Sequence, residues 1–135
     1  MRKIVTSLFL CVLLSMNAQN QAPEATATSG TLTVTASVTY TSPYYYAVWI
    51  KNSAGTYVRT LMMYGQNSKY YSDLVHWNSE SATDKTNATT GATKSSSSTY
   101  VATWDGKDKT KTTTLDDGTY TVSIEMSSQS YGTNS

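Results

Sequence analysis

The sequence predicts an all-β domain, and three observations lead to this prediction. Ser and Thr supply about a third of the chain, and 11 Tyr and 3 Trp accompany a charged fraction of only 14%. Thr, Tyr and Trp favour strands, and the aromatic rings give the chain enough apolar surface to bury. Apolar and polar residues alternate in several stretches, and Asp-Gly pairs at 105–106 and 117–118 suit tight turns. Strands joined by turns explain all three observations.

Residues 1–18 have the form of an export signal. Arg2 and Lys3 precede an apolar stretch from Ile4 to Leu14, which is too short to cross a bilayer. Ala18 offers a small residue at the cleavage point. We therefore expect a periplasmic or secreted mature chain, cut near Ala18.

The expected mature chain is close to neutral and lacks cysteine. Loss of the signal lowers the basic count from 10 to 8 against 9 acidic residues, and removes Cys11, the only cysteine. No disulfide framework, no attraction to nucleic acid and no integral membrane segment are therefore expected. We expect a flexible leader at 19–29, one domain at 30–127 and a disordered tail at 128–135.

The first half of the domain carries three strand patterns. Between residues 31 and 40, apolar residues alternate with Thr or Ser, which predicts a half-buried strand that ends before Pro43. Residues 44–51 are apolar or aromatic on both faces, as expected near the centre of a packed sheet. A turn at Asn52–Gly55 leads to a hairpin partner at 56–63.

The second half combines one short helix, a long loop and further strands. Apolar residues at helical spacing predict a helical turn within 69–78, and residues 79–99 form a polar, low-complexity loop. Strands are expected at 100–104 and 119–126, with a Thr-rich strand between the two Asp-Gly turns. Such antiparallel strands suggest an immunoglobulin-like β-sandwich with one short helix and an incomplete C-terminal edge. A small open barrel is the alternative.

Several blocks of the chain resemble one bacterial family. They are Ala47–Ile50, Asn52–Gly55, Tyr57–Leu61, Thr90–Thr93, and a closing segment of the form W-D-G-x-D … D-G-x-Y at Trp104–Asp108 and Asp117–Tyr120. Together they are similar to the domain-of-unknown-function family 2271 of predicted periplasmic proteins. The closing segment also resembles the immunoglobulin-like domain of flagellar hook-capping proteins. The chain departs from the pattern at Lys109–Thr112, where the linking turn usually carries Gly.

The resemblance also implies that family members continue beyond the last strand with further β structure. The final edge of this chain is then unpaired, and an unpaired edge invites pairing with another chain. We therefore expect a protein partner that binds through an edge strand.

One loop resembles a flavin attachment site. Thr90-Gly91-Ala92-Thr93 is similar to the acceptor of bacterial flavin transferases, which esterify FMN onto the last Thr of such a core, here Thr93. The chain has Asn87 where the acceptor usually begins with Asp. The alternative is an ordinary turn in a Ser/Thr-rich loop.

Metal and catalytic interpretations are weak. Hard cations prefer carboxylate oxygens, but Asp105, Asp108, Asp116 and Asp117 are better explained as turn residues that bond to nearby backbone N–H groups. His76 is the only histidine and has no cysteine beside it, so no zinc site is expected. No metal ligand and no catalytic residue is assigned, because neither a Ser-His-Asp arrangement nor a pair of carboxylates has suitable spacing.

The aromatic residues have two interpretations. The first is an exposed surface that binds sugars, peptides or proteins, and the second, better supported, is core packing. Both concern Tyr44, Tyr45, Tyr46, Tyr70 and Tyr71. Trp49 and Trp104 are expected as core anchors. The sequence therefore predicts a non-enzymatic, exported accessory or assembly module without a cofactor. The alternative is an extracytoplasmic redox carrier with covalent FMN on Thr93.

Overall fold

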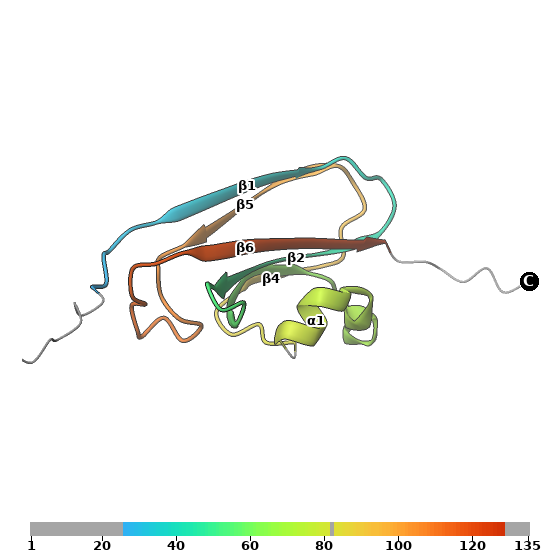
Figure 1. Ribbon diagram of the computed structural model, residues 1–135. Coiled ribbons are helices and arrows are strands. Elements are labelled where there is room, and N and C mark those ends of the chain that lie inside the picture. The colour runs from blue at the N-terminus through green and yellow to red at the C-terminus, as the bar shows by residue number, and fades with distance from the viewer. Residues whose placement is uncertain (1–25, 82, 129–135) are drawn as a thin grey trace, which may run out of the picture.

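The computed structural model describes residues 26–81 and 83–128, and over these residues the chain is an all-β, sandwich-like domain with two sheets (Figure 1). The smaller sheet pairs β1 (Leu32–Val38) with β5 (Ser98–Trp104). The larger sheet has the order β4 (Thr89–Gly91), β3 (Tyr57–Tyr64), β2 (Tyr44–Asn52), β6 (Tyr120–Ser128). The predicted all-β, sandwich-like class with one short helix is confirmed, and the barrel alternative is wrong. The export signal and nearly all of the expected tail lie outside the described residues.

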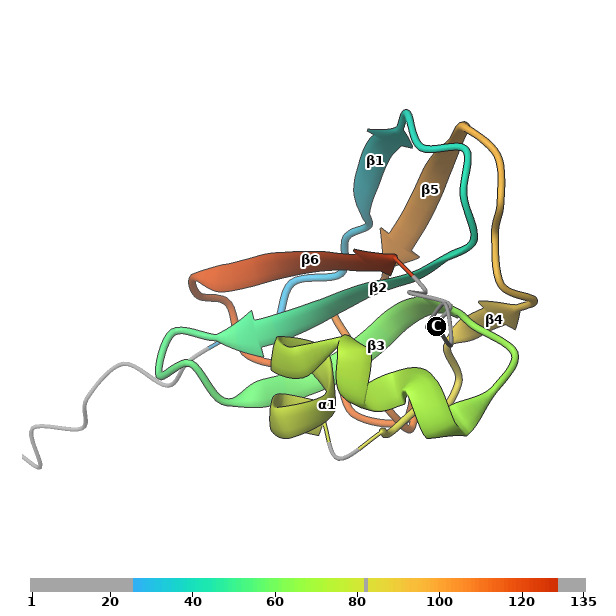
Figure 2. The ribbon, with the colours of Figure 1, turned by 90° about the vertical axis from the view of Figure 1, so that its right-hand side faces the viewer.

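The two faces of the larger sheet are covered by different elements. The β1–β5 pair lies over one face, and the 3₁₀ helix η1 (Ser68–Asp73) and the α-helix α1 (Val75–Ser81) lie over the other (Figure 2). Asn67 begins η1, since its side-chain oxygen accepts a hydrogen bond from the N–H of Lys69 at 3.1 Å. The predicted short helix within 69–78 is therefore confirmed.

β2 is buried on both faces because it lies between these layers. Successive strand residues point to opposite sides of a sheet. Tyr44, Tyr46, Val48 and Ile50 accordingly belong to the core beneath β1 and β5, whereas Tyr45, Ala47 and Trp49 belong to the core beneath the helices. Every residue from 44 to 50 is at most 2% exposed. The prediction of a central strand here is confirmed.

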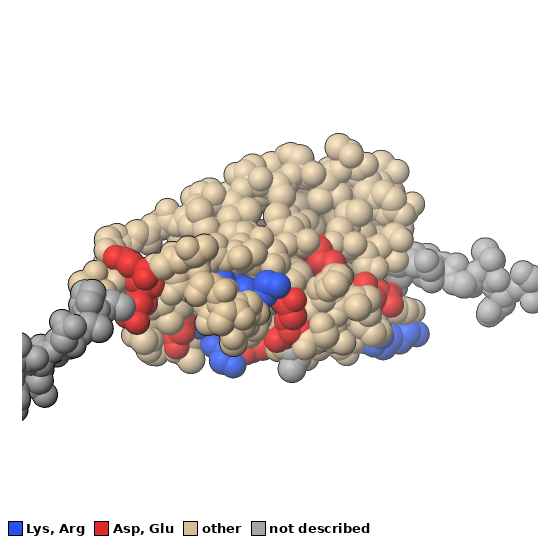
Figure 3. All heavy atoms as spheres, in the orientation of Figure 1, with Lys and Arg blue, Asp and Glu red and all other residues tan. Residues whose placement is uncertain are grey.

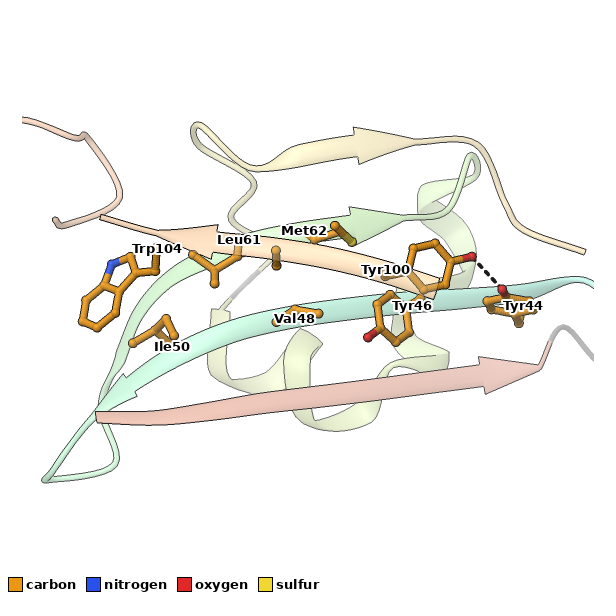
Figure 4. Packing of buried hydrophobic residues seen from close by; sticks show 9 residues of the cluster. Tyr44, Tyr46, Val48, Ile50, Leu61, Met62, Tyr100 and Trp104 are labelled. Carbon is orange, nitrogen blue, oxygen red and sulfur yellow. Dashed lines mark hydrogen bonds between the residues drawn. The ribbon is translucent and has the colours of Figure 1, made fainter. Parts of the chain in front are cut away.

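Tyrosine rings organise the core beneath the smaller sheet. Tyr46 stacks on Tyr100 with 4.6 Å between ring centroids, and the hydroxyl of Tyr44 lies 2.6 Å from that of Tyr100 (Figure 4). Burial, reinforced by the hydrogen bond with Tyr44, raises the pKa of Tyr100. Trp104 packs edge-on against Tyr120 at 4.8 Å. The core interpretation of these aromatic residues is confirmed.

The helical layer is joined to the sheet by polar contacts. The indole Nε1 of the fully buried Trp77 donates to Thr60 Oγ1 on β3 at 2.9 Å. The carboxylate of Glu125 on β6 accepts from the backbone N–H groups of His76 and Trp77, at 3.2 and 2.9 Å. A negative charge at this first turn meets N–H groups that have no partner within the helix.

The structure corrects two predictions about connections. No strand forms between the Asp-Gly pairs: within 105–119 the structure has loop with one isolated bridge, between Lys107 and Thr114. β5 and β6 belong to different sheets, so this segment crosses between layers and cannot be a tight hairpin. The sheets are also not wholly antiparallel. β4 forms inside the long loop expected at 79–99 and pairs in parallel with β3, because the chain returns along the sheet after passing through the helices.

Candidate functional site

The motif Thr90-Gly91-Ala92-Thr93 begins in the edge strand β4. Thr90 and Gly91 pair with Met63 and Tyr64 of β3, and the carbonyl of Gly91 accepts from the N–H of Gly65 at 3.0 Å. A Cβ at position 91 would lie 2.6 Å from Cε1 of Tyr64, which is closer than real side chains approach. Glycine is therefore required here by the close packing of Tyr64, whatever modification the loop carries.

Thr93 stands where the chain leaves this edge. Its side chain is half-buried, and its Oγ1 accepts a hydrogen bond from the N–H of Gln66 at 3.1 Å. The next residue, Lys94, exchanges two backbone hydrogen bonds with Tyr44, at 2.7 and 3.2 Å. The Thr93 hydroxyl is therefore held in place by the end of β3 and the start of β2.

Two grooves flank the motif. One has a volume of about 680 Å³, and Tyr45, Asn67, Tyr70 and Thr93 belong to its lining. The other has a volume of about 360 Å³ and is lined in part by Thr90, Gly91, Ala92 and Lys85. Both volumes lie within the range of small-molecule sites. The Thr93 hydroxyl thus lies on a groove that holds two aromatic rings.

The surroundings of the motif are cationic. Three lysine ammonium groups lie over tyrosine rings, at 4.6 Å for Lys69 over Tyr70, 4.7 Å for Lys85 over Tyr71 and 4.2 Å for Lys94 over Tyr64. The contact with Tyr70 raises the pKa of Lys69. The residues that line the two grooves include no Asp or Glu. Among the described residues, Lys85 is the one charged residue in these two linings, and it belongs to the second groove.

Asp105 and Asp108 of the closing segment bond to nearby backbone N–H groups, as expected, whereas Asp117 bonds to a distant segment. Asp105 accepts from the N–H of Lys107 at 3.2 Å, and Asp108 accepts from those of Thr112 and Thr113 at 3.2 and 3.3 Å. The Asp117 carboxylate accepts from the backbone N–H of Thr28 at 2.9 Å, within the segment predicted as leader. In residues 26–81 and 83–128, no group of three His, Cys, Asp or Glu side chains could hold a metal ion.

His76 is exposed on α1, and its neighbour Glu80 is the more constrained group. Burial opposes ionisation of Glu80, but hydrogen bonds from Trp49 Nε1 at 2.7 Å and Lys51 Nζ at 3.0 Å outweigh it and lower the pKa of the carboxyl. No local pattern predicts this pairing, because 29 positions separate Lys51 from Glu80. A carboxylate held ionised by a lysine and an indole N–H is a structural link between α1 and β2.

These features define a β-sandwich domain with a half-buried threonine on a groove that two tyrosines line and whose lining, in the part of the chain that the structure describes, contains no charged residue. The family model described as a predicted periplasmic protein (DUF2271) matches residues 26–134, so the chain belongs to this family. No curated protein and no solved structure matches the chain. The comparisons give no support to the likeness of the closing segment to flagellar hook-capping proteins. Within the described residues, no helix is long and apolar enough to cross a membrane.

Proposed function

We propose that this periplasmic protein is a non-enzymatic, immunoglobulin-like accessory or assembly module that binds a protein partner through an open sheet edge. One observation carries the proposal: a two-stranded sheet covers a four-stranded one. The edge strand β6 is left partly bare, and its Ile124 and Met126 are 46% and 42% exposed. Exposed apolar side chains beside an unpaired strand are typical of an interaction site.

Site-specific photo-crosslinking in intact cells tests this proposal. A photoreactive phenylalanine analogue is placed at Ile124, and a matched control chain carries it at Ser79, which is exposed on α1 on the opposite face of the sheet. We expect a protein adduct of defined mass from position 124 that position 79 does not give. Equal adducts from both positions, or none from either, would contradict partner binding at this edge.

A second candidate function is an extracytoplasmic electron carrier with FMN on Thr93. Its specific support is the position of the Thr93 hydroxyl beside Tyr45 and Tyr70, in a groove without lining carboxylates. In the reaction, Thr93 Oγ attacks the flavin-side phosphorus of FAD, a pyrophosphate P–O bond breaks, AMP leaves, and the threonine proton passes to the transferase. The partly exposed side chain of Tyr70 offers a surface for the flavin ring, and Lys94, next to Thr93 in the chain, supplies a positive charge for the phosphodiester.

Intact mass and the absorbance spectrum test the second candidate. The protein is co-expressed with a bacterial flavin transferase as wild type, as Thr93→Ala and as Thr89→Ala, a matched control at the exposed residue just before the motif. We expect one added FMN and a yellow protein for the wild type and the control, and neither for Thr93→Ala. A wild-type protein of unmodified mass would remove the idea.

A further inference from the structure

The free edge of β1 lacks the features that normally prevent strands from pairing between molecules. β1 pairs only with β5, so its other edge has no strand partner within the described residues. From Ala25 to Ser42 the chain contains neither a charged residue nor a proline. Soluble proteins usually protect a free edge with lysine, proline or a bulge. Figure 3 shows the same property at the surface, because the part of the molecule formed by β1 and β5 shows no charged side chain on this face.

Apolar surface is uncovered on the same flank of the molecule. β1 and β6 lie along one side of the sandwich in Figure 2, where β5 is to the right of β1 and β2 is below β6. The exposed large apolar residues include Ile124 and Met126 on β6 and Leu32 on β1, the last 42% exposed. The opposite flank ends in β4, whose residues Thr89, Thr90 and Gly91 expose no large apolar side chain. A third strand added beside β1 would lie over β6 and cover its apolar side chains.

A buried hydroxyl on this side also lacks a partner. Tyr46 is 1% exposed, and its hydroxyl has no hydrogen-bond partner among the described residues. Figure 4 shows that this hydroxyl points away from the Tyr44–Tyr100 pair, toward the side on which β6 lies. Tyr46 is opposite Met126 in the β2–β6 register. A buried hydroxyl without a partner is unfavourable, and this one lies on the flank where the apolar side chains of β6 are exposed.

β1 is complementary to itself. In an antiparallel β1–β1 pair centred on Thr35, Leu32 of one copy lies opposite Val38 of the other, and Val34 lies opposite Ala36. The inner-face residues of the two copies therefore lie opposite each other. The outer face then pairs hydroxyl residues, and the existing β1–β5 pair already shows such a contact, with Ser37 Oγ 3.0 Å from Thr99 Oγ1. In a two-fold symmetric pair, any charged side chain on the strand would lie near the same charge of the second copy. β1 has no charged residue, so this repulsion does not arise.

We propose that β1 pairs antiparallel with β1 of a second copy of this chain, which joins the two smaller sheets into one sheet of order β5–β1–β1–β5. This inference rests on the proposed function and names a second copy of the chain as the partner; the strand that pairs is β1, and the exposed side chains of β6 lie on the flank that it covers. The second copy's β1 covers the apolar flank above β6. The two-fold axis passes beside Thr35, whose side chain is exposed on the outer face and is not needed for the core.

Light scattering of the purified, signal-free chain across a concentration series tests the pairing. We expect a dimer for the wild type and for Val101→Lys, a matched control that lies opposite Thr35 on β5 and is 55% exposed. Thr35→Lys places two like charges at the axis and weakens the dimer by on the order of tenfold. Mixing Thr35→Lys with Thr35→Glu restores it as a heterodimer. A monomeric wild type, or a Thr35→Lys chain that dimerises as tightly as the control, would overturn the inference.

Disulfide trapping tests the register independently. Directly opposed residues in an antiparallel pair have Cα atoms about 4.5–5.5 Å apart, within the range that a disulfide spans. We expect oxidised Thr35→Cys to give a covalent dimer and Thr103→Cys, on the outer face of β5, to give none. A dimer in solution that Thr35→Cys fails to trap would contradict pairing through β1. A monomeric chain that still gives the Ile124 adduct with another protein would refute self-pairing and leave the edge-strand function standing.

Discussion

The hydroxyl of Thr60 links the helical layer to the larger sheet, and its removal gives the sharpest stability prediction. Thr60 is fully buried on β3, and its Oγ1 accepts from Trp77 Nε1 at 2.9 Å and donates to the carbonyl of Asp84 at 2.8 Å. Valine has nearly the same shape as threonine, so Thr60→Val removes the hydroxyl without a cavity. The indole N–H of Trp77, which is fully buried, then has no hydrogen-bond acceptor.

The expected cost follows from the groups left without partners. An unsatisfied buried donor costs about 1–3 kcal/mol. The Asp84 carbonyl still accepts a hydrogen bond from the hydroxyl of Tyr57 at 3.3 Å. Trp77 Nε1 is therefore the group that loses its only hydrogen-bond partner among the described residues. We therefore expect Thr60→Val to lower the free energy of unfolding by about 2–3 kcal/mol. In a domain of this size the melting temperature should fall by roughly 10 °C.

Urea unfolding followed by tryptophan fluorescence measures this change. Thr60→Ser keeps the hydroxyl and loses one methyl group, for a cost of about 1 kcal/mol. Thr103→Val, at an exposed position of β5, should lie within about 0.5 kcal/mol of the wild type. The reasoning fails if Thr60→Val also lies within that margin, or if Thr60→Ser is the more destabilised of the two. The m-value should stay constant, since the surface exposed on unfolding is unchanged.

Three further predictions concern the layers around this link. Gly65→Ala should destabilise the chain by about 1–3 kcal/mol in the same urea assay, because its Cβ would overlap the ring of Tyr45. Glu125→Gln should cost about 1 kcal/mol and lower the helical signal in circular dichroism, because the first turn of α1 loses its carboxylate. Burial opposes ionisation of Asp84, but Lys109 Nζ at 2.6 Å and the N–H of Thr86 outweigh it and lower the pKa of the carboxyl. A lowered folded-state pKa stabilises the fold above the ordinary value of 3.8 and loses this effect as the pH falls below it. The urea midpoint should therefore fall less steeply below about pH 4 in Asp84→Asn than in the wild type.

Strands were predictable here wherever the chain itself carries a two-residue period. The alternation in β1 and the two-sided apolar run in β2 gave elements within two residues of those observed. The partners of these strands were not predictable in the same way. β1 pairs with β5, at least 60 positions away, because the core beneath them requires both strands, and no local pattern encodes that requirement.

The candidate site was predictable as a motif but not as a groove. Thr90–Thr93 stood out in the sequence, whereas the rings beside Thr93 come from β2 and η1. The lysine–tyrosine contacts also combine residues that are adjacent in the chain, such as Lys69 and Tyr70, with residues that are distant, such as Lys94 and Tyr64. The packing of η1 against the larger sheet brings Tyr70 to the groove, and the pairing of β4 with β3 brings Lys94 to Tyr64.

The two proposed surfaces lie at opposite ends of the larger sheet and can be separated by experiment. In the order β4–β3–β2–β6, Thr93 follows the first strand, and the bare apolar residues belong to the last. A second copy on β1 therefore leaves the Thr93 groove open, and a flavin on Thr93 leaves the β1 edge free. Thr35→Lys should change self-association and not flavin attachment, whereas Thr93→Ala should do the reverse. If either substitution changes both properties, the two surfaces are coupled through the sheet, and the assignment of separate roles to its two ends is wrong.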